Sequence, residues 1–140
     1  MQILITTTKG TFDVTNLVPT VKWSGDYQQA ARSLDFSVVA SASDKSVPVV
    51  NCPLGAGVQL RASGTVLFDG FVISRTKSTQ QSTLQLSCFD RGLYLKRNKK
   101  SYQFTAATRE TIAAKAAADF GITVGTLAAT GVPITRIFDR

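Results

Sequence analysis

Apolar and polar residues alternate with a period of two from residue 1 to about residue 90 of the sequence. Glycine, proline, asparagine and serine interrupt this alternation at short intervals. Successive side chains of a strand point to opposite faces of a sheet, so the pattern is typical of several short strands with one buried face. The sequence therefore predicts that this part of the chain is all-β.

Four stretches alternate most clearly, and turn-forming residues lie between them. The stretches are centred on Ile3 and Ile5, on Leu34, Phe36 and Val38, on Val58 and Leu60, and on Leu84, Leu86 and Cys88. Hairpin turns are expected at Lys9-Gly10 and Ser63-Gly64. Residues 41–57 are expected to form a long connection, because Pro48 and Pro53 cannot donate a hydrogen bond to a central strand.

The pair Asp69-Gly70 lies between two apolar runs and would ordinarily indicate a two-residue hairpin. The flanking runs, 66–68 and 71–73, are too short to be separate strands. We therefore expect one long bent strand with a β-bulge at Gly70.

The period of the sequence changes after residue 90. Residues 91–96 fit either a short helical turn or the tail of a strand. A helix is expected over residues 109–120, with Thr108 as its N-cap and Gly121 as the left-handed residue that ends it. Its narrow apolar face consists of Ile112, Ala113, Ala116, Ala117 and Phe120.

A length of 140 residues and a hydrophobic content of 44% suit one ordinary core. We expect a β-domain over residues 1–100, followed by residues 101–140, which hold the helix and the beginning of a further element. Strand-like fragments at 132–134 and 137–138 do not complete a unit, so the sequence is expected to be part of a longer chain.

The residues that usually carry chemistry are scarce. Histidine is absent, which removes the commonest general base and metal ligand. The acidic residues are scattered and are expected to lie in turns or on the surface. Cys52 and Cys88 are expected to be free thiols, with Cys88 acting as a small buried hydrophobic residue. We therefore expect no enzyme activity, no metal and no cofactor.

The net charge of +7 favours contact with nucleic acid, acidic proteins or anionic surfaces. Its densest part is the run from residue 96 to residue 100, in which Lys96, Arg97, Lys99 and Lys100 are basic. This run either contacts phosphate or is a solvated loop between two elements, and the absence of interleaved aromatic residues favours the loop.

Trp23 and Tyr27 flank the polar residues 24–26. The pair fits an exposed recognition loop, but a tryptophan at the end of a strand is more often buried. We therefore expect Trp23 in the core and no ligand at this loop.

Six strings of the sequence occur in a fixed order: 10–18, which begins Gly10-Thr11-Phe12-Asp13-Val14, then 21–27, 30–37, 67–72, 88–95 and the helix with its Gly-Ile end, 108–124. In this order they resemble the N-terminal part of phage tail baseplate hub proteins of the XkdQ/YqbQ type. The family is related to the hubs of contractile tails and to the N-terminal region of VgrG proteins.

The resemblance implies a fold that is mainly β with one α-helix (α+β): a β-barrel or sandwich like that of tail tubes, followed by helix 109–120. It implies a homo-trimeric hub that adapts a sixfold tail tube to a threefold spike. The implied partners are the spike protein and the tube-initiator or baseplate proteins, with DNA or a tape-measure protein passing through the lumen. Lys96, Arg97, Lys99 and Lys100 would then face the lumen or a partner, and the helix face at 112–120 would contact a neighbouring subunit.

The implied location is the baseplate of a virion tail that assembles in the cytoplasm of a bacterial host. Residues 1–8 lack the basic leader and apolar run of a secretory signal, and no long apolar stretch predicts a membrane span. The alternative function is an OB-like β-barrel that binds nucleic acid, which requires aromatic side chains on one exposed strand face. Phe36, Phe68 and Phe71 lie in apolar alternation instead, which favours core positions.

Overall fold

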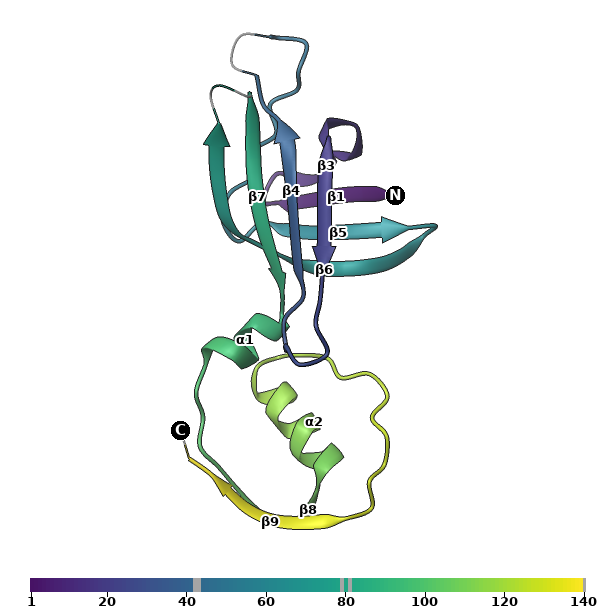
Figure 1. The fold of residues 1–140 in the computed structure, drawn as a ribbon, viewed down its shortest axis with the longest axis vertical. Helices are drawn as coiled ribbons and strands as arrows, with labels where there is room; N and C mark the ends of the chain where they lie inside the picture. The colour runs from purple at the N-terminus through teal and green to yellow at the C-terminus, as the bar shows by residue number, and fades with distance from the viewer. Residues whose placement is uncertain (42–43, 79, 81, 140) are drawn as a thin grey trace. The chain divides into compact units, whose positions relative to one another are not determined.

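A computed structural model of the chain describes residues 1–41, 44–78, 80 and 82–139. The chain divides into two compact units, Met1–Leu93 and Tyr94–Arg140. Both are drawn in Figure 1 and are described separately below. The boundary expected after residue 100 lies inside the second unit.

The first unit is a seven-stranded antiparallel sheet in the order β2-β1-β5-β6-β7-β4-β3. The strands are β1 (Gln2–Thr7), β2 (Gly10–Asp13), β3 (Thr20–Ser24), β4 (Ser33–Val39), β5 (Gly57–Ala62), β6 (Thr65–Ser78) and β7 (Thr83–Asp90), with the short 3-10 helix η1 at Thr15–Leu17. The expected hairpins and alternating strands are confirmed, and the described part of residues 41–56 contains no strand.

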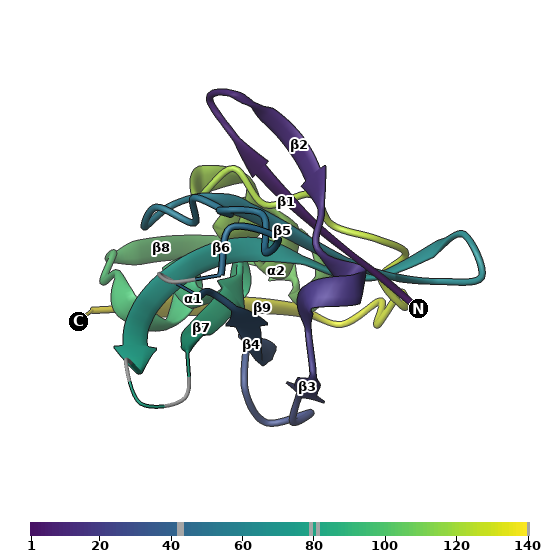
Figure 2. The ribbon, with the colours of Figure 1, turned by 90° about the horizontal axis from the view of Figure 1, so that it is seen from above.

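The strand β6 holds the two halves of the sheet together. Its 14 residues pair first with β5, up to Phe71, and then with β7, from Gly70 onward. The sheet bends along this strand, and β1 and β5 cross β3, β4 and β7 at a steep angle (Figure 1, and from above in Figure 2). The arrangement is that of a sheet folded over onto itself, as in an orthogonal β-sandwich. The expected mainly β fold is confirmed.

One apolar core fills the space between the two halves of the sheet. The strands β1, β4, β5, β6 and β7 contribute alternate residues, as the period of two requires. The buried cluster consists of Ile3, Ile5, Val14, Leu34, Phe36, Val38, Cys52, Ala56, Val58, Leu60, Phe68, Val72, Leu86 and Cys88. Among the described residues no polar or charged side chain is buried, so apolar burial accounts for the cohesion of this unit.

The predicted bulge at Gly70 is wrong, whereas the single long bent strand is confirmed. Gly70 pairs in regular register with Val58 on one side and Asp90 on the other. The register shifts on either side of it, at Leu60/Arg61 of β5 and at Val72/Ser74 of β6. Gly70 is needed for close packing instead, because a Cβ atom there would lie 2.3 Å from the Phe89 carbonyl oxygen and 2.6 Å from Cζ of Phe68.

The second unit contains an antiparallel ribbon of β8 (Tyr102–Thr108) and β9 (Pro133–Phe138), joined through α2 (Arg109–Asp119). The helix α1 (Gly92–Arg97) spans the division between the units, so residues 91–96 contain a helical turn and not a strand tail. The strand β8 was not predicted from the sequence. Its pairing is irregular between Phe104 and Ala107, and Ala106 adopts a positive φ of 49°, so the strand lacks regular alternation.

The expected helix over residues 109–120 is confirmed as α2, with Thr108 as N-cap and Phe120 as C-cap. Gly121 has a φ of 64° and donates its N–H to the Ala118 carbonyl at 3.0 Å. The N–H of Ile122 donates to the Ala117 carbonyl at 2.9 Å. These two bonds form a Schellman motif, the ending that the Gly-Ile pair predicted.

Substituting Gly70 by alanine is expected to destabilise the first unit by about 2–3 kcal/mol, because the added methyl group must displace the backbone of β7 or the ring of Phe68. Urea unfolding of the full chain, followed by the fluorescence of its one tryptophan, Trp23, measures the change. The matched control is Gly57→Ala in β5, where the nearest atom to an added Cβ is 3.6 Å away. Equal stability of the two variants would contradict this account of Gly70.

Candidate assembly surfaces

The described part of the chain contains no group of three or more His, Cys, Asp or Glu side chains able to hold a metal ion. Four aspartates instead hold turns, as their positions predicted. In each case the carboxylate accepts the backbone N–H two residues later, as in an Asx turn. The pairs are Asp13 with Thr15, Asp26 with Gln28, Asp44 with Ser46 and Asp90 with Gly92.

Both cysteines are free and buried, as expected. Burial, with a smaller contribution from the negative charge of Asp35, raises the pKa of the Cys88 thiol to about 12. A thiol that stays protonated at neutral pH is a poor nucleophile. Cys88 therefore serves the core as a small hydrophobic residue.

The basic run predicted as a contact site is exposed along its whole length. Lys96 and Arg97 end α1, and Lys99 and Lys100 follow it. Nζ of Lys100 lies 2.8 Å from Oδ2 of Asp119 in α2, and this bond raises the pKa of Lys100 and lowers that of Asp119. Part of the positive charge of the run is thus paired within the unit.

The apolar face of α2 is covered unevenly. Ala117 is buried, Ala113 is exposed, and Ile112, Ala116 and Phe120 lie between these limits. Ala116 and Phe120 line a hollow of about 280 Å³ whose other walls include Tyr102 and three lysines of the basic run, Lys96, Lys99 and Lys100. The structure therefore brings residues of the basic run and residues of the α2 face to one hollow. Their role in contacts with a partner remains a prediction.

The second unit has a very small core. Of its described side chains only Phe104 and Ala117 are buried. The ring of Phe104 stacks on Tyr102 at 5.6 Å between centroids and meets Phe138 edge-on at 6.2 Å. Ile137 on the same ribbon is 70% exposed. A single ribbon and one helix bury too little apolar surface for independent stability, so this unit needs a further covering surface.

Glu110, in the first turn of α2, ties the helix to the segment before β9. Its Oε2 accepts the Thr130 hydroxyl at 2.6 Å and the Thr130 backbone N–H at 3.2 Å. The hydrogen bond from the Thr130 hydroxyl is the largest of the effects that lower the pKa of Glu110 to about 2. The carboxylate also lies at the positive end of the helix dipole.

The end of β3 and the loop that follows it carry exposed aromatic side chains. Trp23 is 44% exposed and Tyr27 is 95% exposed, so the predicted core position of Trp23 is wrong. Trp23 lies on β3, which is the edge strand at one end of the sheet. An edge strand has a neighbouring strand on one side only, so the side chain of Trp23 is left partly exposed. The two aromatic residues line an open hollow with Asp26 and Arg32.

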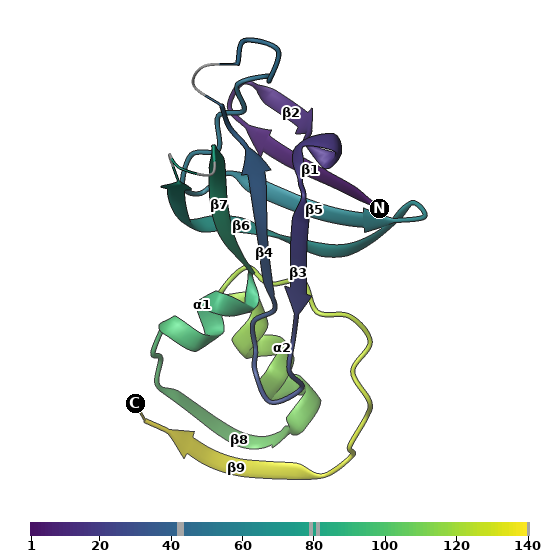
Figure 3. The ribbon, with the colours of Figure 1, turned by 45° about the horizontal axis from the view of Figure 1, so that its top comes forward.

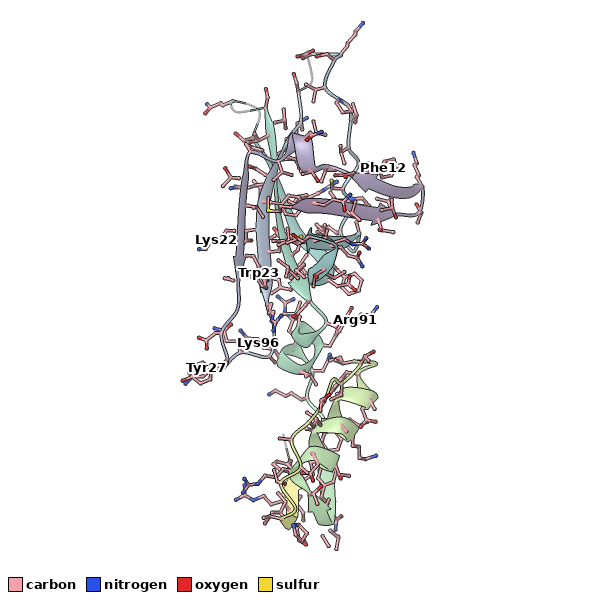
Figure 4. All side chains as sticks on the ribbon, turned by 90° about the vertical axis from the view of Figure 1, so that its right-hand side faces the viewer. Phe12, Lys22, Trp23, Tyr27, Arg91 and Lys96 are labelled. Carbon is pink, nitrogen blue, oxygen red and sulfur yellow. The ribbon has the colours of Figure 1, made fainter. Side chains whose placement is uncertain are left out.

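The sequence offered an exposed recognition loop as an alternative, because two aromatic residues flank Ser-Gly-Asp and a polar stretch follows them. A core position for Trp23 was favoured over it. Figure 3 shows this loop at the end of the β3–β4 hairpin, and Figure 4 shows Tyr27 pointing away from the sheet. Trp, Tyr and Arg are the residue types that dominate the energetics of protein interfaces.

At the other end of the sheet order, β2 borders a second hollow. Phe12 on β2 is 44% exposed and Val49 is 93% exposed. They line a hollow of about 590 Å³ together with Leu17 and Lys9. Among the described residues, the first unit therefore has an edge strand at each end of its sheet, β2 and β3, each paired with one neighbouring strand only.

The family model described as YQBQ-like matches residues 21–140. The chain belongs to this family. Among curated proteins, the chain is 31% identical over 117 residues to the phage-like element PBSX protein XkdQ of Bacillus subtilis. That match covers 84% of this chain and 35% of XkdQ, so the chain spans about a third of the length of its relative.

Among solved structures, the chain resembles the 43 kDa tail protein of prophage MuSo2 from Shewanella oneidensis, with a TM-score of 0.73. The similarity covers 99% of this chain and 44% of that protein, at 16% sequence identity, and it concerns the fold. The chain thus belongs to a family whose curated relative comes from a phage-like element, as the resemblance implied, and its fold is similar to that of a prophage tail protein.

The relatives give no support to the OB-like nucleic-acid-binding alternative. The structure also lacks its expected aromatic face, since Phe36 and Phe68 are 3% and 2% exposed. Phe71 is partly exposed and lies under the Arg91 guanidinium, 5.5 Å from the ring centroid. None of the helices in the described residues is long and apolar enough to cross a membrane.

The low pKa of Glu110 predicts a pH dependence for the second unit. A carboxylate with a depressed pKa stabilises the folded state above its unfolded value, about 4.5, and this contribution is lost as the pH falls toward about 2. The protection of the Thr130 amide from exchange, measured relative to its intrinsic rate at each pH, is therefore expected to fall over this range, and Glu110→Gln is expected to remove the dependence.

Glu110 is the one glutamate of the chain, so its titration can be followed by NMR without overlap from others. The matched control is Thr130→Val, which removes the hydroxyl and leaves the backbone donor. A Glu110 that titrates near 4.5 in the folded chain would contradict the hydrogen-bonded geometry.

Proposed function

We propose that this chain is part of a baseplate hub in a phage or phage-like contractile tail, where it adapts the sixfold tail tube to the threefold spike. The observation that supports the proposal is that the chain exposes sheet edges and apolar side chains that a neighbouring subunit could cover. Among the described residues, the folded-over sheet has an edge strand with one unpaired side at each end, and the second unit leaves most of its apolar side chains uncovered. Such surfaces suit a chain that is stabilised by its neighbours in an assembly.

The proposed assembly is a homo-trimer that contacts the spike protein and the tube-initiator or baseplate proteins. Heterologous contacts that repeat around an axis close into a ring, and a ring leaves a lumen through which DNA or a tape-measure protein passes. In this role the chain resides in the baseplate of the virion tail and assembles in the host cytoplasm.

Two groups of residues have proposed roles in this hub. The exposed ammonium groups of Lys96 and Lys99, with Arg97, contact an anionic partner or the contents of the lumen. The face of α2 from Ile112 to Phe120 supplies a subunit contact, because it is only partly covered within its own unit. Lys100 contributes less free charge, since Asp119 already pairs with it. No side chain in this role has to react.

The mass of the purified chain in solution, alone and with the tail spike protein, tests the proposal. Multi-angle light scattering at low and high salt is expected to give a trimer or a complex of threefold stoichiometry that survives high salt, because apolar contacts are not screened. A chain that stays monomeric, ignores the spike and binds single-stranded DNA with steep salt dependence would contradict the hub role.

A further inference from the structure

Apolar side chains and lysines together line the hollow between the basic run and α2. The apolar side chains are those of Leu95, Tyr102, Ala116 and Phe120, and the lysines are three of the four basic residues of the run. All of them belong to the second unit; we refer to this site as the lysine hollow. We propose that the lysine hollow binds an acidic segment of a partner protein, with one apolar side chain of that segment inserted into it.

The charged side chains of the lysine hollow have one sign. Among the described residues no acidic side chain lines it. Lys96 and Lys99 are exposed and form no ion pair within the described part of the chain. Because these two charges are uncompensated, they are available to the carboxylates of a partner, and complementary charge steers and orients such a contact.

Two carboxylates lie near the basic run without cancelling its charge. Asp119 is committed to Lys100, whose Nζ lies 2.8 Å from its Oδ2. Asp139 accepts the Ser101 hydroxyl at 2.7 Å. The hydrogen bond from Lys100 and, to a smaller extent, the charge of Lys115 on α2 lower the pKa of Asp119, so Lys115 adds to the positive field. Basic groups therefore outnumber acidic groups around the lysine hollow.

The basic run is held in place by the chain itself. The backbone N–H and the side-chain amide of Asn98 donate to the Tyr94 carbonyl at 3.1 and 2.9 Å. These bonds fix the chain where it leaves α1, between the first and the second pair of basic residues. The Lys100 ammonium group also lies 5.5 Å from the centroid of the Tyr102 ring. A backbone that is already ordered loses less conformational entropy when a partner binds.

The size and lining of the lysine hollow suit a single apolar side chain. Its volume is about 280 Å³, whereas pockets for small molecules have about 300–1,000 Å³. Leu95 is 37% exposed, and Ala116 and Phe120 are partly exposed. An apolar side chain of a partner would remove this apolar surface from water, which stabilises the complex. A segment in which carboxylates flank an apolar residue therefore matches both components of the site.

The aromatic residues favour a protein segment over a nucleic acid as the occupant. Bases of a single strand stack on exposed aromatic faces. The Tyr102 ring is partly buried and already stacks on Phe104, with 5.6 Å between centroids, and Phe120 is also partly buried. The most exposed apolar side chain of the lining is that of Leu95, which is aliphatic. The proposed site rests on the hub role for the presence of a protein partner and specifies the chemistry of the segment that binds.

Binding of a short acidic peptide to the full chain tests this site. The probe is a fluorescein-labelled peptide with one phenylalanine between two pairs of glutamates, and fluorescence anisotropy at low salt measures its affinity. Replacing the phenylalanine of the probe by alanine is expected to weaken binding at least about fivefold, because the apolar contact is lost at equal charge. A thymidine oligonucleotide with the same number of negative charges is expected to bind at least about fivefold more weakly, because it finds no free aromatic face.

Two pairs of charge variants locate the binding site. Lys96→Gln combined with Lys99→Gln is expected to weaken binding of the phenylalanine probe about tenfold, because both uncompensated charges are removed. The matched control combines Lys45→Gln with Lys77→Gln, exposed lysines of the first unit, and changes the net charge by the same amount. Equal weakening by the two pairs would show that the overall charge attracts the probe, and would overturn the site.

A variant of α2 tests the apolar contact separately from the charge. Ala116→Leu narrows the lysine hollow and is expected to abolish the preference for the phenylalanine probe over the alanine probe. Ala113→Leu, an exposed position of the same helix outside the hollow, is expected to retain this preference. Leucine is a strong helix former, so both variants keep α2. A preference that persists in Ala116→Leu overturns the insertion of an apolar side chain.

The outcomes separate this site from the hub role. A phenylalanine probe that does not bind, in a chain that forms a threefold complex with the spike protein, overturns the site and leaves the hub proposal standing. A selective probe in a chain that stays monomeric and ignores the spike supports the site and contradicts the hub proposal. An oligonucleotide that binds as tightly as the phenylalanine probe, and loses affinity in the same lysine variants, assigns the hollow to nucleic acid and overturns the acidic segment as its occupant.

Discussion

The sharing of β6 between two halves of one sheet is the interaction on which the first unit depends. The strand pairs with β5 over its first part and with β7 over its second part, and Gly70 takes part in both pairings. Because Gly70 has no side chain, the Phe89 backbone and the Phe68 ring approach it closely. This approach lets the sheet bend and enclose Ile3, Leu34 and Leu86 in one core.

The sequence was sufficient for the parts of the fold that follow a strict period. Leu34, Phe36 and Val38 alternate with polar residues and are all buried. Successive side chains of a strand point to opposite faces of the sheet, so these three share the face that lines the core. The end of α2 followed from Gly121, whose positive φ is costly for other residues. Longer-range geometry was not accessible in this way. The bulges beside Gly70 depend on how three strands meet, and β8 is defined by its pairing with β9.

The candidate surfaces were predictable only where they follow from local sequence, and not where they depend on long-range packing. The exposure of the basic run from Lys96 to Lys100 followed from its composition, whereas its bond to Asp119 depends on the packing of α2. Trp23 was misplaced because the sequence does not specify that its strand ends the sheet. The exposed side chains of Trp23 on β3 and of Tyr27 on the following loop are available to a partner, whereas the buried aromatic side chains are not.

The central proposal is that this member of the YQBQ-like family contacts its partners through its edge strands and loops. Hydrogen exchange of the chain, free and in complex with the spike protein, tests this claim most directly. The account predicts slower exchange in β2, β3 and the loop that carries Tyr27 upon assembly, with little change in β6 and β7. Unchanged exchange at both ends of the sheet, in a complex of verified stoichiometry, would contradict it.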